Sequence, residues 1–419
     1  MKVGTNNQLH IDEIESVEAF INSHWEDTVR ISLDDNGTTI GLPFPYTVPC
    51  RKGTFQELYY WDTYFTCLGL IQSRREDLVL LNSRNFLYLI NRFGFIPNGS
   101  RTYYLNRSQP PYFAALIRLL SQTGVDDKFA AEVLCGLKKE YQFWKTRRAT
   151  PIGLARFGNH ASVAELREFF DAIAERAQLT GETEQEKLAE ASHTLSEAES
   201  GWDFSPRFDH RCEDFCPVDL NSNLYLYEEL LAEASMGAEQ QEWRLRAAQR
   251  REWLTEFCWD AKQGAFFDYD FKKRRRGTIL AASSFHPLWA GVATKEQAAL
   301  VRQKTLPRLE VEFGIATCER GVRKRLCQWD FPNAWPCLQS IVYQGLARYG
   351  YIEDARRVAG KYVDIVCRAF RKTGDLWEKY NAQDGTSESN EEAGWVAPAM
   401  MGWTAGVFMD AVAFLRNNR

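Results

Sequence analysis

The chain has 419 residues, of which 45% are hydrophobic and 26% are charged, and its formal net charge is −5. This length can bury a large core, and the acidic balance excludes a broad basic face for nucleic acid. Aromatic residues make up 13% of the chain and include 13 tryptophans, which is more than a core usually needs and favours a cleft lined with aromatic rings.

Apolar residues recur at helical spacing along most of the chain. Residues 11–29 predict an amphipathic helix with an acidic first turn, and the segment that follows, to about residue 54, is typical of a loop. Residues 266–271 alternate like a short strand, and other strand signals are few. The remaining predicted helices are 57–72, 75–93, 110–122, 126–147, 161–198 with a break near 180–182, 220–248 continuing into 253–258, 295–306, 333–349, 352–370 and 402–416.

Helices of two kinds are expected in this series. Residues 64–71 and 339–349 are apolar on all sides and suit buried inner helices, whereas the amphipathic helices suit an outer layer. This pattern predicts an all-α fold, an α/α barrel with its site in the loops at one end. An open helical solenoid would show a repeat of about 34–47 residues, and none is visible. We expect residues 1–50 to form a helix and an extended arm packed on the barrel, and residues 51–419 to form the barrel.

The motifs of several familiar chemistries are absent from the sequence. It contains no G-x-S-x-G, H-E-x-x-H, Walker or G-x-G-x-x-G motif, and its six histidines lack metal-binding spacing. We therefore expect no metal, no cofactor and no nucleotide. The charged, alanine-rich segment 161–198 is interpreted as structural.

The spacing of the cysteines and the length of the apolar runs indicate the cellular compartment of the protein. The ten scattered cysteines predict buried thiols in a reducing cytoplasm rather than disulfides or a zinc site. The N-terminal residues lack the pattern of a signal peptide, and no apolar stretch approaches the ~20 residues of a membrane span. The basic cluster 272–276 is interpreted as a solvated turn. We expect a cytoplasmic protein with neither a membrane nor a nucleic-acid partner.

Three stretches combine aromatic rings with a Trp-Asp pair: residues 57–62 (ELYYWD), 199–204 (ESGWDF) and 328–335 (QWDFPNAW). Aromatic faces can stack on the C–H faces of a sugar, and carboxylates and amides can pair with its hydroxyl groups. These stretches therefore predict one pocket, lined from several elements, for a small saccharide.

Cleavage of a glycosidic bond needs one carboxylic acid to protonate the leaving oxygen and one carboxylate to activate water or to attack carbon. Asp203 lies between Trp202 and Phe204. Apolar neighbours would raise its pKa and keep it protonated near neutral pH, as a general acid requires. The alternative is that Asp203 caps the next helix or pairs with Arg207.

The second carboxylate is expected in the C-terminal loop. There, Glu378 precedes a polar stretch, and the adjacent Glu391 and Glu392 precede the last predicted helix. Other polar groups have two interpretations each. Arg107 and Gln109 either hold sugar hydroxyls or cap a neighbouring helix, and the aspartates of the first and third Trp-Asp pairs either accept bonds from hydroxyls or stabilise turns.

At these residues the chain resembles the trehalase family of glycoside hydrolases. Residues 328–339 (QWDFPNAWPCLQ) resemble one family signature, and residues 52–70 (KGTFQELYYWDTYFTCLGL) resemble the other. The resemblance extends from about residue 51 to residue 408. Further support comes from residues 95–113, 199–208, 217–225 and 402–408.

The resemblance implies an (α/α)6 barrel and metal-free hydrolysis of α,α-trehalose to glucose, with inversion at the anomeric carbon. It places the general acid at Asp203 and the general base at Glu391 or Glu392. In an inverting enzyme these carboxyl groups lie ~6.5–9.5 Å apart, with one water between them. The sugar contacts that the resemblance implies are Trp61, Asp62, Asn98, Arg107, Gln109, Gln328, Trp329 and Asp330.

Departures from the family pattern fall on loops that are expected to hold the two sugars. Gln56 stands where family members typically have an arginine. The arginine- and proline-rich stretch before residue 199 and the glycine run before the base glutamate are not recognisable. Two alternatives follow. One is a related α-glycosidase acting on another small α-glucoside or α-mannoside, and the other, from a different class, is a non-catalytic sugar-binding protein.

Overall fold

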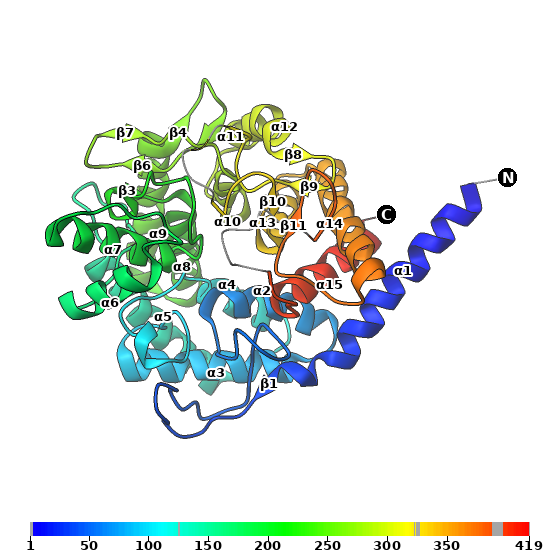
Figure 1. Ribbon diagram of the computed structural model, residues 1–419, viewed down its shortest axis with the longest axis horizontal. Coiled ribbons are helices and arrows are strands. Elements are labelled where there is room, and N and C mark those ends of the chain that lie inside the picture. The colour runs from blue at the N-terminus through cyan, green and yellow to red at the C-terminus, as the bar shows by residue number, and fades with distance from the viewer. Residues whose placement is uncertain (1–2, 125, 322, 324–326, 388–396, 419) are drawn as a thin grey trace.

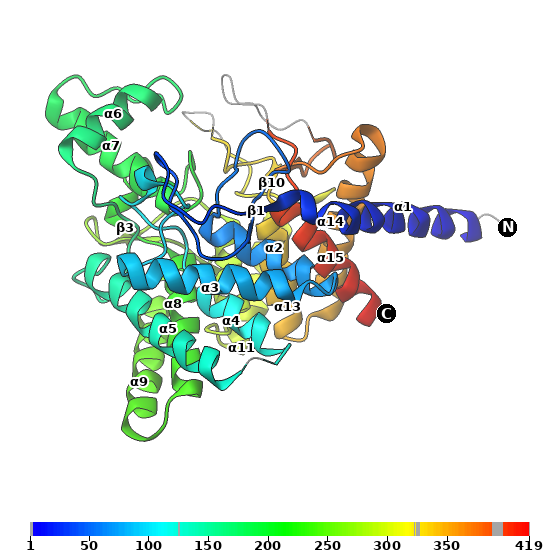
Figure 2. The same cartoon turned by 90° about the horizontal axis from the view of Figure 1, so that it is seen from below.

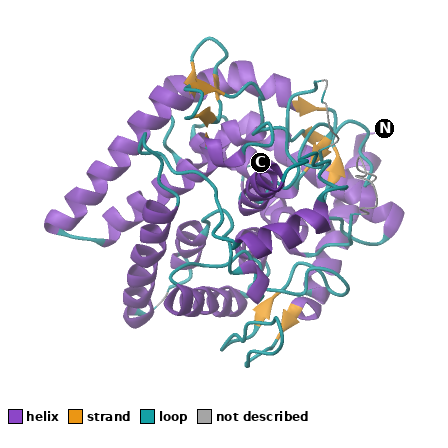
Figure 3. Cartoon of the chain, turned by 60° about the vertical axis from the view of Figure 1, so that its left-hand side comes forward, coloured by secondary structure: helices purple, strands orange, loops and turns teal. Residues whose placement is uncertain are grey.

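The computed structural model describes residues 3–418 except 125, 322, 324–326 and 388–396. Within these residues the chain is mostly helical, and every strand is two residues long (Figures 1 and 3). This confirms the predicted all-α class.

Six helices form a closed ring in which each contacts the next (Figure 1). They are buried around most of their circumference, as in α2, where only the last two of 13 residues are not buried. This agrees with their all-round apolar sequences. The six inner helices are α2 (Tyr60–Gln72), α4 (Phe113–Ser121), α8 (Val218–Ala234), α10 (His286–Ala290), α13 (Pro336–Arg348) and α15 (Gly402–Asn417).

Outer helices alternate with the inner ones along the chain. The helix α3 packs on α2, α5 and α9 pack on α8, and α14 packs on both α13 and α15. Six inner helices, each preceded in the chain by outer helical segments, make the predicted (α/α)6 barrel. The outer helices are α1 (Val3–His24), α3 (Glu76–Phe93), α5 (Asp127–Arg147), α9 (Gly237–Trp253), α11 (Lys295–Leu300), α12 (Leu306–Leu309) and α14 (Ile352–Thr373).

The first helix, α1, packs on α14 and extends beyond the barrel (Figure 2). The division of the chain at residue 50 stays a prediction. Two further helices, α6 (Val163–Ile173) and α7 (Glu184–Glu199), interrupt the alternation and pack on each other. Each begins with a capping box, from Ser162 and from Thr183, which explains the break predicted near residues 180–182.

The strands lie in the connections between helices and pair antiparallel. They are β1 (Val29–Arg30) with β2 (Tyr46–Thr47), β3 (Phe215–Cys216) with β6 (Tyr269–Asp270), β6 with β7 (Arg275–Arg276), β4 (Trp259–Asp260) with β5 (Ala265–Phe266), β8 (Glu310–Val311) with β9 (Gly314–Ile315), and β10 (Asn333–Ala334) with β11 (Tyr380–Asn381).

Three segments differ from the predicted helices. The segment 220–248 is two helices, because Ser235 is extended and Gly237 is left-handed with φ +60°. The segment 295–306 contains a π-helical turn at Val301–Thr305, and Leu254–Cys258 is a second such turn. The inner helix α10 was not predicted, because five residues are too few to show a helical period.

Several predictions about thiols and charge are confirmed. All ten cysteines lie in the described part of the chain and are free, and nine of them are buried. The basic cluster 272–276 forms the largely exposed turn between β6 and β7. Among the described helices, none combines the length and the apolar character that crossing a membrane requires.

A buried ion-pair network supports the barrel beside α8. The guanidinium group of Arg207 is fully buried, and it donates to Asp219 at 2.8 and 3.0 Å and to Asp268 at 3.0 and 2.9 Å. It also lies 4.2 Å from the ring centre of Trp202. Arg207 therefore holds two buried carboxylates and one of the tryptophans predicted near the site.

Replacing Arg207 by methionine is expected to lower the free energy of unfolding by about 3–5 kcal/mol, because two buried carboxylates lose their cation. Urea denaturation at neutral pH measures this. The matched control is Arg416→Met, which breaks a half-exposed pair with Glu18 and should cost less than about 1 kcal/mol. Equal losses in the two variants would contradict the prediction.

Candidate active site

A cavity of about 180 Å³ lies at the N-terminal ends of α2, α13 and α15. Trp61 and Trp403 are the second residues of α2 and α15, and Trp335 precedes the first residue of α13, so three helix starts meet at the cavity. The positive ends of these helix dipoles point to the same side.

Five tryptophans pack together beneath the cavity. The rings of Trp329 and Trp335 stack with centres 3.7 Å apart, and Trp202 stacks on Trp329 at 5.2 Å. Trp61 and Trp403 meet edge to face at 5.8 Å, and Trp61 lies 5.6 Å from Trp329. Residues from four distant segments therefore build one rigid aromatic floor, as the Trp-Asp pairs predicted.

Asp203 lines the cavity and is half-buried. Its turn needs a glycine at position 201, because the left-handed backbone there (φ +73°) places a side chain 2.7 Å from the ring of Trp61. The local alternatives for Asp203 do not occur among the described contacts. Arg207 pairs with other aspartates, and the residue before α8 is Pro217.

Burial raises the pKa of Asp203 to about 6. The guanidinium groups of Arg107 and Arg176 oppose this shift, and the carboxylate of Glu378 adds to it. Desolvation disfavours the charged form, so the proton is held to a higher pH. Asp203 therefore carries its proton in mildly acidic solution, and its role as the general acid stays a prediction.

Two more carboxyl groups line the same cavity, those of Asp62 and Glu378. Asp62 lies in the first turn of α2, and burial raises its pKa to about 7, with Glu378 and Asp203 adding to the shift. Glu378 is buried and pairs with Lys379 at 2.8 Å, and the Lys379 ammonium lies 4.7 Å from the ring centre of Trp335. Three acids thus face one aromatic-floored space.

The predicted base candidates Glu391 and Glu392 lie outside the described residues. Seven of the eight predicted sugar contacts line the cavity. The eighth, Asp330, does not lie among the described lining residues. It pairs with Arg323 at 2.8 and 3.2 Å and accepts a bond from the backbone N–H of Phe331, which matches the turn-stabilising alternative. The seven are Trp61, Asp62, Asn98, Arg107, Gln109, Gln328 and Trp329.

Gln109 caps a helix, which is one of the two roles predicted for it, and its contact with a sugar stays a prediction. It lines the cavity, and its side-chain oxygen accepts bonds from the backbone N–H groups of Tyr60 at 3.1 Å and Trp61 at 3.2 Å. It therefore caps the start of α2. Arg107 lies over the ring of Tyr104 at 4.9 Å, and its buried Nε has no hydrogen-bond partner within the described residues.

Gln56, the neutral residue at the position where the family typically has an arginine, is not among the described lining residues of the cavity. The side-chain oxygen of Gln56 accepts two bonds from Arg30, at 3.1 and 2.7 Å, and its amide donates to the carbonyls of Cys50 and Thr54. All its polar groups are used outside the cavity. The departure seen in the sequence is therefore accompanied by a local network of its own.

Arg176 was missed by the sequence interpretation, which regarded segment 161–198 as structural. The residue follows α6, lines the cavity and lies 4.5 Å from the ring centre of Phe204, next to Asp203. Its segment shows only a charged, alanine-rich pattern, so no local signal marks it. Tyr59 and Tyr104, whose hydroxyl groups lie 3.1 Å apart, also line the cavity and were not predicted.

An (α/α)6 barrel with a carboxyl-bearing, tryptophan-floored cavity at one end defines the class of barrel glycosidases. The chain matches the trehalase family over residues 7–416 and belongs to that family.

Solved structures share this fold. The chain is similar to the neutral trehalase from Saccharomyces cerevisiae, with a TM-score of 0.76 and 27% identity, over 95% of this chain and 80% of that one. It is also similar to the mannosylglycerate hydrolase from Thermus thermophilus in complex with Tris and D-glycerate, with a TM-score of 0.62 and 15% identity, over 95% and 99%. At that identity the likeness shows the fold alone.

Proposed function

We propose that this protein is a trehalase-like glycosidase that hydrolyses α,α-trehalose to two molecules of glucose with inversion at the anomeric carbon. The observation that carries the proposal is Asp203, a carboxyl group with a raised pKa at the edge of a tryptophan-floored cavity that holds further carboxyl groups. Membership of the trehalase family and the likeness to a yeast neutral trehalase support it. The ten free thiols support a cytoplasmic location.

In the proposed reaction, Asp203 gives its proton to the glycosidic oxygen as the bond from that oxygen to the anomeric carbon breaks. A water molecule attacks the anomeric carbon from the opposite face and loses a proton to a glutamate. The resemblance to the family favours Glu391 or Glu392 as this base. Glu378 is the competing candidate, because it lines the cavity with Asp203.

The remaining cavity groups suit a neutral sugar. Trp61 and Trp329 both line the cavity although each is almost fully buried, so the parts of their rings that reach it offer an apolar contact for the C–H groups of a glucose ring. The amides of Asn98 and Gln328, both buried, can each donate and accept bonds from hydroxyl groups. Substrate binding is thus proposed to combine an aromatic floor with a polar wall.

A second candidate is the hydrolysis of another small α-glucoside or an α-mannoside. Two observations favour it. Gln56 is held by Arg30 outside the cavity, and Arg176 enters the cavity from a segment without the family's usual pattern. The mannosylglycerate hydrolase with the same fold makes a mannosyl solute a reasonable member of the test panel.

The test is a substrate panel with purified protein. We expect glucose release from trehalose, with one α- and one β-glucose appearing together in the proton NMR spectrum, because inversion changes only the attacked sugar. Turnover of mannosylglycerate or another α-glycoside without turnover of trehalose selects the second candidate. Sugar binding without turnover of any panel member favours the non-catalytic alternative.

The pH dependence of kcat/KM follows from Asp203. Its acid form is the active one, and its pKa is about 6, so kcat/KM is expected to fall about tenfold per pH unit above that value. Initial rates at low substrate concentration across the range from mildly acidic to alkaline pH measure this. A kcat/KM that rises through neutral pH would contradict the assignment of Asp203 as the acid.

A further inference from the structure

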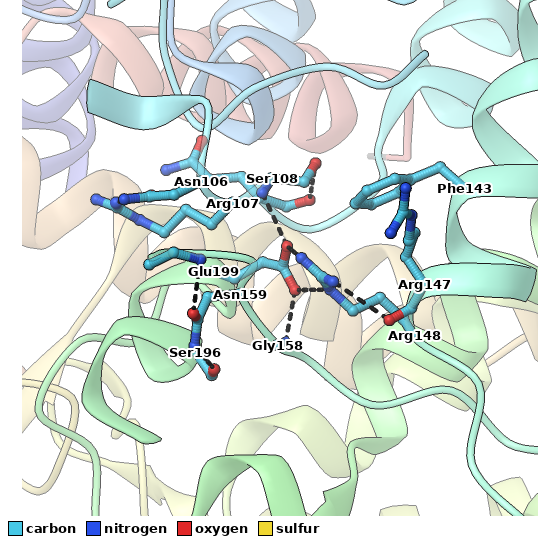
Figure 4. A network of polar contacts seen from close by, with 12 residues as sticks. Asn106, Arg107, Ser108, Phe143, Arg147, Arg148, Gly158, Asn159, Ser196 and Glu199 are labelled. Atoms are coloured by element: carbon cyan, nitrogen blue, oxygen red, sulfur yellow. Dashed lines mark hydrogen bonds and ion pairs between the residues drawn. The ribbon is translucent and has the colours of Figure 1, made fainter. Parts of the chain in front are cut away.

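Glu199 is a fully buried carboxylate that directly follows Ala198, a residue of the cavity lining. Its two carboxylate oxygens accept hydrogen bonds from Nε and Nη2 of Arg148, each at 2.7 Å. They also accept hydrogen bonds from the backbone N–H groups of Ser108 at 2.8 Å and of Gly158 at 2.7 Å. Figure 4 shows it at the centre of these contacts. All four bonds join segments that are distant in the sequence.

This position is costly for a glutamate. Glu199 is the last residue of α7, where the negative end of the helix dipole disfavours a carboxylate. Burial adds a desolvation cost, which the buried guanidinium of Arg148 offsets. Breaches of local preference of this kind occur mainly at functional sites.

The bond to Ser108 connects Glu199 with the loop that contributes Arg107 and Gln109 to the cavity. Ser108 lies between Arg107 and Gln109, which both line the cavity. Gln109 caps α2 and so holds the start of the helix that carries Trp61. The loop is closed on its other side, because the backbone N–H of Asn98 donates to the carbonyl of Arg107 at 3.1 Å.

Glu199 also begins the turn that carries Asp203. The backbone reaches Asp203 four residues later, through Gly201, which packs against Trp61. The guanidinium of Arg107 lies close enough to Asp203 to favour its charged form. One carboxylate therefore joins the turn of the proposed acid to the loop of the cation beside it.

We propose that Glu199 is a positioning residue for the glycosidase reaction, which through the backbone of Ser108 fixes Arg107 and Gln109 relative to Asp203. It touches no substrate. The inference rests on the proposed function, since its main readout is turnover.

The test is Glu199→Gln, assayed on whichever panel substrate the wild type hydrolyses. Glutamine keeps the size of the side chain, but it removes the charge that holds Arg148 and weakens the bond to Ser108. We expect kcat/KM to fall by about 10- to 100-fold, the effect of a small misplacement of catalytic groups. The assay is run at a temperature at which circular dichroism shows both proteins to be fully folded.

The pH profile separates positioning from simple loss of charge. Removing a negative charge near Asp203 would lower the pKa of Asp203 and move the alkaline limb of kcat/KM to lower pH. Withdrawal of Arg107 from Asp203 does the opposite, because the carboxylate loses a favourable cation. We expect the alkaline limb of Glu199→Gln to lie at higher pH than that of the wild type.

Glu228→Gln is the matched control. Glu228 is buried and pairs with the buried Arg250 at 2.7 Å, in the same chemistry but on α8 and without lining the cavity. We expect this variant to lose stability and to keep wild-type kinetic constants and pH profile.

Glu199→Asp keeps the negative charge that pairs with Arg148, but its shorter side chain reaches less far toward the backbone N–H of Ser108. This variant is used in place of Glu199→Gln if Glu199→Gln does not fold. It is expected to show the same fall in kcat/KM and the same direction of the alkaline limb. A folded Glu199 variant with wild-type kcat/KM, or with the limb at lower pH, would overturn the inference. A wild type that turns over nothing in the panel refutes the proposed function instead.

Discussion

Asp203→Asn is expected to lower kcat/KM on trehalose by about 10²–10⁴-fold, because asparagine keeps the shape of the side chain but has no acidic proton for the leaving oxygen. Sugar binding should persist, because the tryptophans and the amides of Asn98 and Gln328 that line the cavity remain in place. Steady-state kinetics and a binding titration followed by tryptophan fluorescence measure the two effects separately.

α-Glucosyl fluoride provides the control for this variant. Fluoride leaves without being protonated, so a variant that lacks only the acid should lose much less activity on this substrate than on trehalose. Equal losses on both substrates would show that Asp203 has another role. Retention of wild-type activity on trehalose would remove Asp203 from the mechanism.

The same variant has a consequence for stability. The pKa of Asp203 is raised from its ordinary value to about 6, so between about pH 4 and 6 the folded protein binds more protons than the unfolded chain. The free energy of unfolding therefore falls as the pH rises through this window. Asparagine cannot lose a proton, so the Tm of Asp203→Asn should exceed that of the wild type at pH 8 and match it below pH 4.

The barrel itself could be predicted from the sequence because its inner and outer helices bury different fractions of their surface. The run 64–71 and the run 339–349 are apolar on every side, and both lie in inner helices. The helix α10 was not predicted, because five residues between loops are too few to show a helical hydrophobic period. The break after α8 was not predicted either, because the left-handed Gly237 interrupts the helix although the apolar pattern continues through it.

The site could be predicted where rings and carboxyl groups are adjacent in the sequence, and not where partners meet across the fold. Asp203 is flanked by aromatic residues, and the structure places it in the cavity. Arg176 gave no signal, because its neighbours form an ordinary charged segment. The pairing of Glu199 with Arg148 joins residues 51 apart in the chain, so nothing in either local sequence marks a buried carboxylate.

If Glu378 takes the proton from water, Glu378→Gln is expected to lower kcat/KM on trehalose by about 10²–10⁴-fold. The substitution also leaves Lys379, which is 1% exposed, without its partner. Breaking a buried pair costs about 3–5 kcal/mol, so lost activity alone could reflect unfolding. The double variant Glu378→Gln/Lys379→Met removes the unpaired charge, and it should recover stability without recovering activity.

Comparison with Glu391→Gln and Glu392→Gln identifies the base. A missing base blocks the attack of water whatever the leaving group, so the base variant stays inactive on α-glucosyl fluoride, whereas Asp203→Asn does not. Azide needs no deprotonation before it attacks, so it should restore turnover in the base variant alone and yield the β-glucosyl azide that inversion requires. A Glu378→Gln protein with wild-type kcat/KM would instead leave the base among the two later glutamates.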